Sequence, residues 1–420
     1  MDIKKPKIVI ITSGQPSINP RLVKEADALV EAGYKVKVIY QYRTVWASRL
    51  DLSLLATKKW DFVCVGGSPT SERIQYAYTR VRYKIGRFLA KYIDLKNNIA
   101  ELALGRCTWE LAKEAKKTPA TIYIAHNLAA LPAATSAAKH YNVKCGFDAE
   151  DFHRQEQTDD IENFSYRLSK FIEDKYLSKV HYFSTSSTLI AKEYQKIYPD
   201  IAPIIINNVF PLSFLQTENL VNNGEQLKLF WFSQTIGRKR GIEDAIKAIA
   251  LLKKDNISLT ILGHVSEDDK NYFQALANEI TLKSNQLNFA KPINPDDIFS
   301  FASKFDIGLA LETGFCLNNN IALSNKLFTY LTAGLAVIAS ETDAQKDFLK
   351  MNPTIGASFP IGDINSFSNK IKMFENDKQL LLKTKRDALN IAKNNYNWEK
   401  HSGVLVYKIN NLLEINLKKK

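Results

Sequence analysis

Short apolar runs alternate with segments of helical periodicity along the first half of the chain. Lys7 to Thr12 is a β-branched run that predicts a strand, and Arg21 to Ala32, closed by Gly33, has the spacing of a helix. Val36 to Tyr40 predicts a second strand, which completes a βαβ unit. We expect further strands in this half at Phe62 to Val65, Ala120 to Ala125, Gly146 to Ala149 and His181 to Ser184.

The same alternation restarts in the second half. Leu227 to Phe232 and Ser258 to Leu262 predict strands, and Gly241 to Leu252 predicts the helix between them. Leu335 to Ala339 predicts a buried parallel strand, directly after a short helix that Gly334 ends. The polar, aperiodic stretch from Thr217 to Gly224 predicts a linker between the halves.

This alternation predicts an α/β protein with two Rossmann-like, doubly wound domains, at residues 1–210 and 225–390. Domains of this kind bind ligands at the carboxyl ends of their parallel strands, so we expect a cleft between the two strand ends. A length of 420 residues fits two domains of roughly 200 residues each.

Composition narrows the class of protein. The content of 45% hydrophobic and 24% charged residues is globular, and no apolar run approaches the roughly 20 residues that a membrane helix needs. The N-terminus leads into a strand rather than a signal sequence, so we expect a cytoplasmic protein. Four scattered cysteines show no zinc, redox or disulfide spacing and predict buried free thiols: Cys64, Cys107, Cys145 and Cys316.

The net charge of +13 indicates an anionic partner, and part of it is concentrated in one helix, from Arg73 to Lys91. Six basic residues there surround an apolar stripe that steps by four and three positions: Ile74, Tyr78, Val81, Ile85, Phe88 and Tyr92. We expect the stripe to pack into the domain and the basic face to stay in solvent. The alternative is a helix that presents aromatic and basic groups to an anionic membrane surface.

Polar residues at strand ends are the candidate binding groups. In the first half, Gly14 allows close backbone approach, Asn19 lies on the same loop, and Arg21 is a candidate for holding an acceptor's phosphate. In the second half, Arg238, Lys239 and Arg240 stand beside Gly241 and suit a pyrophosphate. Ser324, Asn325 and Lys326 supply a hydroxyl, an amide and an ammonium where a helix begins, which also favours phosphate.

Acidic pairs of the kind that bind metal in nucleotide-sugar sites are present, but they read as helix caps. Asp268 and Asp269 follow Ser266, and Asp296 and Asp297 follow Asn294 and a proline. A metal site would therefore have to use the carboxylates at the end of the expected strand from Gly146 to Ala149, namely Asp148, Glu150 and Asp151. There is no zinc, calcium, P-loop or G-x-G-x-x-G spacing, and we expect no metal.

Six motifs in order, SGQPSINPR, AHN, DAEDFH, SQTIGRKRGIED, LTILGH and SNKLFTYLTAGLAVIAS, resemble the GT-B glycosyltransferases, specifically their large retaining family 4. The resemblance covers nearly the whole chain and extends to Asn397-Trp398-Glu399. It implies a C-terminal helix, within residues 391–420, that crosses back to the N-terminal domain.

The resemblance implies sugar transfer from a nucleotide-diphosphate sugar, bound by the C-terminal domain, to a carbohydrate or lipid-linked acceptor on the N-terminal one. Such a hexosyltransferase-type enzyme needs no metal and no cofactor, since the nucleotide sugar is a substrate. Glu312 matches the first acid of the family's two-glutamate motif, and His126 matches a histidine that faces donor sugar and acceptor. Arg238, Arg240, Ser324, Asn325 and Lys326 match its donor-binding groups.

One position departs from the family. The motif's second glutamate, which binds the nucleotide ribose, falls at Thr329, and one hydroxyl cannot bind both ribose hydroxyls as a carboxylate can. This departure keeps open a non-catalytic GT-B binding protein, and the shared two-domain architecture keeps open a nucleotide-sugar epimerase. Nucleic-acid binding lacks a recognition motif and is not expected. Polysaccharide or glycolipid assembly at the inner face of a membrane is the context that the resemblance implies.

Overall fold

The computed structural model describes residues 6–216 and 226–414, so the predicted linker from Thr217 to Gly224 lies outside the described residues. The chain divides into two compact units. The N-terminal unit comprises the chain up to Ile206, residues 316–318 and the chain from Ser402 onward. The C-terminal unit comprises residues 207–315 and 319–401.

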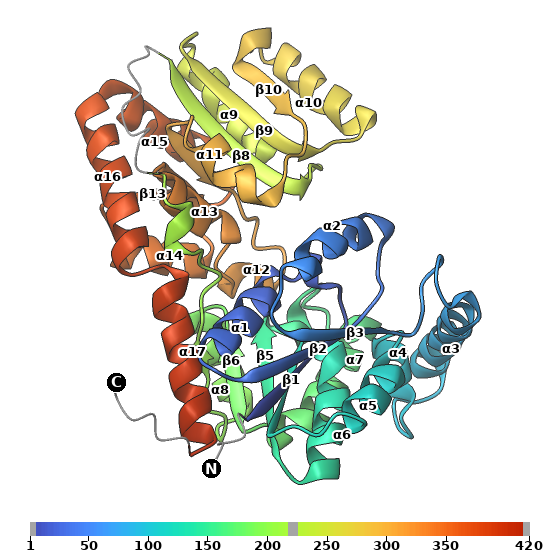
Figure 1. Cartoon of the computed structure of the whole chain (residues 1–420). Helices are drawn as coiled ribbons and strands as arrows, with labels where there is room; N and C mark the ends of the chain where they lie inside the picture. Colours follow the sequence, from blue (N-terminus) through green and yellow to red (C-terminus); the bar gives the residue numbers. More distant parts are fainter. Residues whose placement is uncertain (1–5, 217–225, 415–420) are drawn as a thin grey trace. The chain divides into compact units, whose positions relative to one another are not determined.

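The N-terminal unit is built on a seven-stranded parallel sheet in the order β3-β2-β1-β4-β5-β6-β7 (Figure 1). Its strands and helices are β1 (Lys7–Thr12), α1 (Pro20–Glu31), β2 (Lys35–Gln41), α2 (Val45–Ala56), β3 (Asp61–Val65), α3 (Arg73–Tyr92), α4 (Ile99–Leu104), α5 (Thr108–Lys116), β4 (Ile122–His126), α6 (Leu131–Tyr141), β5 (Lys144–Glu150), α7 (Phe164–Tyr176), β6 (Tyr182–Thr185), α8 (Thr188–Ile197) and β7 (Ile204–Ile205).

The C-terminal unit has a six-stranded parallel sheet in the order β10-β9-β8-β11-β12-β13. The elements of the second half are β8 (Leu227–Thr235), α9 (Ile242–Leu252), β9 (Ile257–His264), α10 (Glu267–Glu279), β10 (Leu287–Ala290), α11 (Ile298–Ala302), β11 (Ile307–Ala310), α12 (Leu317–Ile321), α13 (Asn325–Ala333), β12 (Ala336–Ser340), α14 (Asp343–Met351), β13 (Gly356–Phe359), α15 (Ile364–Asn376), α16 (Lys378–Asn394) and α17 (Trp398–Leu412).

These two sheets confirm the predicted α/β architecture of two Rossmann-like domains. Inner strands are buried on both faces, as the continuous apolar runs predicted, and β4 and β12 are buried at every position. The edge strand β3 is largely exposed. The last helix, α17, joins the N-terminal unit from Ser402 onward. There Leu405 and Ile409 are buried, and the hydroxyl of Tyr34 donates a hydrogen bond to Asn410.

The prediction that the apolar stripe of α3 packs into the domain is wrong. Its six side chains are 53% to 89% exposed. Instead the opposite, small face of the helix is buried, at Thr79, Gly86 and Ala90, and packs on α4. A Cβ at Gly86 would lie 2.7 Å from Cβ of Leu102, so the two helices meet at closest approach through glycine. Figure 1 shows α3 at the edge of the N-terminal unit.

Two further expectations can be compared with the structure. All four cysteines are free, as predicted, but only Cys107, Cys145 and Cys316 are buried, whereas Cys64 is exposed on the edge strand β3. Among the helices of residues 6–216 and 226–414, none is both long enough and apolar enough to cross a membrane.

Candidate functional site

Glu312 lies just beyond the carboxyl end of β11, in the C-terminal unit. Its backbone N–H donates to Oγ of Ser340 at 2.8 Å, and that hydroxyl donates back to the Glu312 carbonyl at 2.6 Å. Ser340 is the last residue of β12, the strand that pairs with β11. The glutamate is therefore fixed to two neighbouring strand ends of the sheet.

Three donors converge on the Glu312 carboxylate. Oε1 accepts from Ser324 Oγ and from Lys326 Nζ, both at 2.8 Å, and Oε2 accepts from Asn319 Nδ2 at 3.2 Å. Burial alone would raise the pKa of Glu312, but the Lys326 ammonium and these hydrogen bonds outweigh it and lower the pKa. Glu312 is therefore ionised at neutral pH and orients the side chains at the start of α13.

The start of α13 keeps donors for an anion because Ser324 does not cap it. Ser324 occupies the N-cap position, yet its hydroxyl makes no hydrogen bond to the helix backbone and donates to Glu312 instead. The first N–H groups of a helix have no partner within the helix and carry the positive end of its dipole. The exposed Asn325 and the half-buried Lys326 stand at this end.

Lys326 and Arg240 are held over the same indole. The Lys326 ammonium lies 5.6 Å from the centroid of the Trp231 ring, and the Arg240 guanidinium lies 5.4 Å from it. Nη1 of Arg240 also donates to Ser233 Oγ at 2.8 Å and to the Thr235 carbonyl at 2.5 Å. Trp231 thus brings the two predicted phosphate-binding cations, 86 positions apart in the sequence, to one end of the sheet.

Arg238 is turned away from this pair. Its Nε donates to Asp269 at 2.9 Å, its Nη2 donates to Asp268, and its guanidinium stacks on Tyr272 at 4.4 Å from the ring centroid. All three partners belong to α10. The structure therefore does not group Arg238 with Arg240 and Lys326, and its donor-binding role remains a prediction. The two aspartates lie in the first turn of α10, which Ser266 caps as expected.

Thr329 is 2% exposed, and its hydroxyl donates to the carbonyl of Asn325 at 3.1 Å. The hydroxyl is therefore used within α13, where serine and threonine commonly bond the preceding turn. This arrangement gives no support to the predicted ribose contact at this position.

The strand ends of the N-terminal unit carry a second polar cluster. In the register of the sheet His126 of β4 pairs with Thr12 of β1 on one side and with Asp148 of β5 on the other. Arg21 and Glu25, one turn apart on α1, reach this edge from the adjoining helix. The α1 helix starts where Asn19 accepts a hydrogen bond from the N–H of Leu22.

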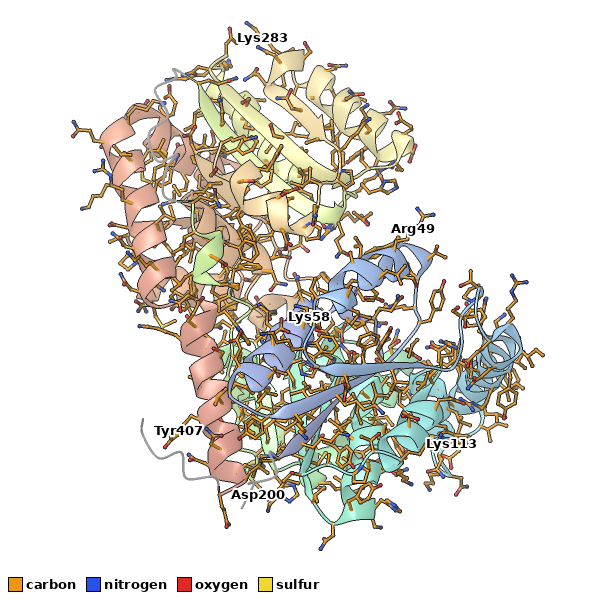
Figure 2. The ribbon with its side chains drawn as sticks, in the orientation of Figure 1. Arg49, Lys58, Lys113, Asp200, Lys283 and Tyr407 are labelled. Carbon is orange, nitrogen blue, oxygen red and sulfur yellow. The ribbon has the colours of Figure 1, made fainter. Side chains whose placement is uncertain are left out.

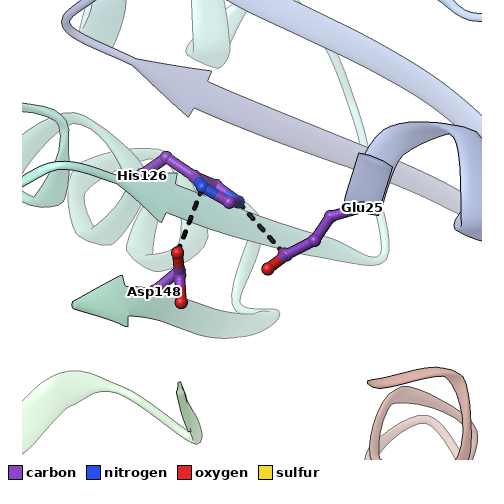
Figure 3. Close-up of side chains that lie close together, drawn as sticks. All are labelled: Glu25, His126 and Asp148. Atoms are coloured by element: carbon purple, nitrogen blue, oxygen red, sulfur yellow. Dashed lines mark hydrogen bonds and ion pairs between the residues drawn. The ribbon is translucent and has the colours of Figure 1, made fainter. Parts of the chain in front are cut away.

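The cluster is a closed network of ion pairs. His126 Nε2 lies 3.1 Å from Glu25 and Nδ1 lies 3.3 Å from Asp148 (Figure 3). Arg21 donates to both oxygens of Asp148, at 2.6 and 2.7 Å, and to the carbonyl of Ile206. All four side chains are at most 2% exposed.

Charge balance explains the pKa shifts within this network. Burial would lower the pKa of His126, but the carboxylates of Glu25 and Asp148 outweigh it and raise that pKa. Burial would raise the pKa of Asp148, but Arg21 and His126 lower it. Two cations then face two anions, which is how buried charges are tolerated.

Glu25, His126 and Asp148 also have the chemistry of a metal site. Their ligand atoms lie within 4.8 Å of one another, the one such group among the residues that the structure describes. The Arg21 guanidinium, however, already supplies a positive charge to Asp148 in two hydrogen bonds and lies 3.6 Å from Glu25. A divalent cation here would meet the charge of Arg21 at close range, so the residues do not fit a metal.

The predicted acceptor residues lie in the interior of the N-terminal unit. Gly14 is buried, and its N–H donates to Oγ1 of Thr12 at 3.1 Å. Asn19 caps α1, and Arg21 is engaged by Asp148 and Glu25. In this arrangement Arg21 does not point toward an acceptor phosphate, and neither nitrogen of His126 faces solvent. Their acceptor and catalytic roles remain predictions.

Asp148, Glu150 and Asp151 do not converge as a ligand set. Asp148 belongs to the network above, and Glu150 has a left-handed φ of 49°, which bends the chain after β5. Asp151 accepts from Asn318 Nδ2 at 3.0 Å, and burial together with Glu150 and Glu156 raises its pKa to about 7.

Sequence reasoning missed Trp231, Asn319, Ser340 and Glu25, all of which position the groups above. Glu25 had a signal, since it follows Arg21 by four residues on one helical face. Ser340 ends β12, where position indicates a role but residue type alone does not. Trp231 lies in the middle of β8 and is 1% exposed, so in the sequence it looks like an ordinary core aromatic residue.

A family model matches the part of the chain that contains the Glu312 and Lys326 cluster. Residues 217–397 match the family described as Glycosyl transferases group 1. No curated protein sequence matches the chain significantly.

Solved structures match over nearly the whole chain. Sucrose-phosphate synthase from Thermosynechococcus elongatus is 13% identical, with a TM-score of 0.70 over 98% of this chain and 100% of that one. A glycosyltransferase from Rickettsia africae is 13% identical, with a TM-score of 0.69 over 98% and 99%. HepE from Anabaena, solved with UDP and glucose, is 12% identical, with a TM-score of 0.68 over 97% and 100%. The resemblance to GT-B glycosyltransferases is confirmed, and membership of the retaining family 4 stays a prediction.

Proposed function

We propose that this chain, a GT-B protein that carries a group 1 glycosyl transferase domain at residues 217–397, transfers a hexose from a nucleotide-diphosphate sugar with retention and without a metal. The observation that carries this proposal is the meeting of Lys326, Arg240 and the uncapped start of α13 around Trp231 and Glu312. Solved neighbours bound to UDP and UDP-glucose make these the first ligands to test.

The leaving diphosphate is the group that this cluster suits. As the bond between the sugar's anomeric carbon and the phosphate oxygen breaks, negative charge grows on that oxygen. Lys326, Arg240 and the backbone N–H groups of Asn325 and Lys326 would neutralise it, the task that a metal performs elsewhere. Glu312, which is ionised and held by three donors, would orient sugar hydroxyls or stabilise the positive charge that develops on the ring.

Retention fits a front-face route. The acceptor hydroxyl attacks the anomeric carbon on the face from which the diphosphate leaves, and its proton passes to the departing phosphate oxygen. This route needs no protein base, which agrees with a His126 enclosed by carboxylates.

The acceptor is the part of the proposal that rests on the resemblance. We infer a carbohydrate or lipid-linked acceptor bound by the N-terminal unit, in polysaccharide or glycolipid assembly on the cytoplasmic side of a membrane. Neither the non-catalytic alternative nor the epimerase is adopted. A non-catalytic protein has no need of an ionised Glu312 beside a diphosphate site, and the best-placed histidine for an epimerase, His126, is 1% exposed.

The test is thermal stabilisation by a panel of nucleoside diphosphates and nucleotide sugars, with and without a chelator. A ligand that binds only the folded state raises Tm by mass action. We expect one nucleotide to stabilise the wild type in chelator, Lys326→Gln to abolish the shift, and Arg240→Gln to reduce it. Arg238→Gln is the matched control, because its guanidinium is held by α10, and it should keep the shift.

Two results would overturn the proposal. Stabilisation by no nucleotide would remove the donor site, and stabilisation only with a divalent cation would remove metal independence. Product analysis separates the enzyme classes: release of nucleoside diphosphate with sugar transferred to an acceptor supports transfer, whereas interconversion of the nucleotide sugar without acceptor would indicate an epimerase.

A further inference from the structure

The helix α3 has three distinct faces. Thr79, Gly86 and Ala90 form the face that packs on α4. At 3.6 residues per turn, the exposed apolar stripe lies roughly 140° around the axis from this buried face. Five exposed basic residues form a row along one border of the stripe: Arg73, Arg80, Lys84, Arg87 and Lys91.

The stripe is exposed because α3 packs on the domain through its other side. Close approach at Gly86, and the ion pair of Arg82 with Glu110 at 2.6 Å, fix the helix through its other side. Six large apolar or aromatic side chains are thereby held in solvent: Ile74, Tyr78, Val81, Ile85, Phe88 and Tyr92. An exposed apolar patch of this size, rimmed by polar groups, marks an interaction surface.

The bordering cations are not neutralised by acids of the protein. Over Arg73–Tyr92 the sequence has six basic and no acidic residues. Within the part of the chain that the structure describes, Arg82 alone of the six forms an ion pair with a carboxylate. The others contact aromatic rings, as Arg80 does with Tyr76 and Arg87 does with Tyr83 and Phe164, or extend into solvent.

Charge complementarity selects the occupant of this surface. A second copy of the chain would bring the same row of basic residues against itself, so self-association through α3 is disfavoured. Nucleic acid would meet the cations but leave the apolar stripe in water. An anionic lipid bilayer offers both partners at once, acyl chains for the stripe and phosphate headgroups for the cations.

We propose that α3 lies flat on an anionic membrane, with its stripe in the interfacial region and Arg73, Arg80, Lys84, Arg87 and Lys91 at the headgroups. The surface belongs to the N-terminal unit alone and does not rest on the proposed function, because it requires neither a donor nor an acceptor. It also meets the requirement that membrane binding take two signals, an apolar one and a basic one.

The experiment is vesicle flotation of the full chain with vesicles of phosphatidylcholine alone and with about a third of phosphatidylglycerol, a lipid content chosen to supply the surface potential on which basic segments depend. One variant removes apolar side chains, by Ile85→Gln and Phe88→Gln. A second reverses charges, by Arg80→Glu, Lys84→Glu and Lys91→Glu. Gln and Glu keep helix propensity, and circular dichroism with Tm confirms folding.

Matched controls make the same chemical changes elsewhere. Leu251→Gln with Tyr407→Gln removes two other exposed apolar side chains, 52% and 69% exposed; Figure 2 shows Tyr407 projecting outward from α17. Lys304→Glu, Lys350→Glu and Lys383→Glu reverse three exposed charges in the C-terminal unit.

We expect the wild type to float with anionic vesicles and not with neutral ones, and both α3 variants to lose at least tenfold in partition coefficient while both controls retain it. Raising the salt to 0.5 M should weaken wild-type binding, since exposed charges are screened. The proposal is overturned if the wild type fails to bind anionic vesicles, or if the α3 variants bind as the wild type does. It is equally overturned if the control variants lose binding as much as the α3 variants.

Discussion

Both units place a polar cluster at the carboxyl ends of parallel strands, yet the two clusters differ in how their charges are satisfied. Around His126, two carboxylates meet a guanidinium and an imidazole, and each charge has a protein partner at no more than 2% exposure. Around Lys326, a single carboxylate meets one ammonium, and Arg240 is held by a hydroxyl, a carbonyl and an indole instead of an acid.

We interpret this difference as that between a structural network and the donor site that we propose. A closed, buried network has no charge left for a ligand, and its loss leaves an uncompensated ion in the interior. A cluster with excess positive charge, at a helix start with free N–H groups, gains its missing anion from a ligand. Clusters at the same position in the two sheets thus differ in charge balance, and on this difference we base the proposal that only the C-terminal one binds a ligand.

The largest expected effect is on stability, from Arg21→Met. Removing the guanidinium leaves the carboxylates of Asp148 and Glu25 buried without their cationic partner. This should lower the free energy of unfolding by about 3–5 kcal/mol. Arg238→Met is the matched control, since it also removes an arginine with two carboxylate partners, but at the surface, where about 1 kcal/mol or less is at stake. Urea denaturation measures both. Equal losses would mean that burial does not distinguish the two clusters.

Lys326→Gln should have the opposite effect: a loss of activity with little loss of stability. Glutamine can still donate a hydrogen bond to Glu312, so the fold should hold, but the charge that we propose to face the leaving diphosphate is gone. We expect kcat/KM for sugar transfer to fall about 10²–10³-fold, the usual loss when one electrostatic donor is removed. Nucleoside diphosphate release, measured in parallel with Tm, tests this. A variant that loses stability but not turnover would place Lys326 in the scaffold.

Arg240→Gln should cause a smaller loss, because Lys326, which lies over the same indole, would still contact the diphosphate in the proposed site. We expect donor binding about tenfold weaker, close to 1.4 kcal/mol, and no comparable change for Arg238→Gln. Titration calorimetry with the nucleotide that stabilises the wild type gives both values. Equal effects of the two variants would show that Arg238 leaves α10 when the donor binds.

The smallest effect is a pH dependence from His126. Its folded-state pKa is raised, so the stability it contributes is complete below its ordinary pKa of about 6.5 and is lost as the pH rises through the folded value. Unfolding free energies between pH 5.5 and 9 should therefore decline on the alkaline side in the wild type. His126→Gln should flatten that decline, and an unchanged slope in the variant would assign the dependence to another group.

Strand positions were the part of the fold that the sequence predicted best. Lys7 to Thr12 coincides with β1, and Leu335 to Ala339 differs from β12 by one residue at each end. Buried parallel strands are short apolar runs between helices, so the pattern that identifies them is local. The caps at Ser266 and Gly334 were likewise local and are present.

The predictions that the structure does not support concern which neighbouring surface a side chain packs against. Periodicity showed that α3 has an apolar side but not that its small side is the one that packs, because close approach through Gly86 needs no large residue. Arg238 and Arg240 are two residues apart, but their side chains have different partners. Arg238 binds residues of α10, whereas Arg240 lies over the ring of Trp231. Pairings between distant segments of this kind leave no local pattern.

The membership of α17 in the N-terminal unit affects how this protein is made. Domains generally fold as they emerge during synthesis, the N-terminal one first. Here the N-terminal unit lacks Leu405, Ile409 and the Tyr34 partner Asn410 until the last residues have been translated. Its final packing therefore waits for the whole C-terminal unit, so a ribosome that stops short of Ser402 releases a chain whose first unit is incomplete.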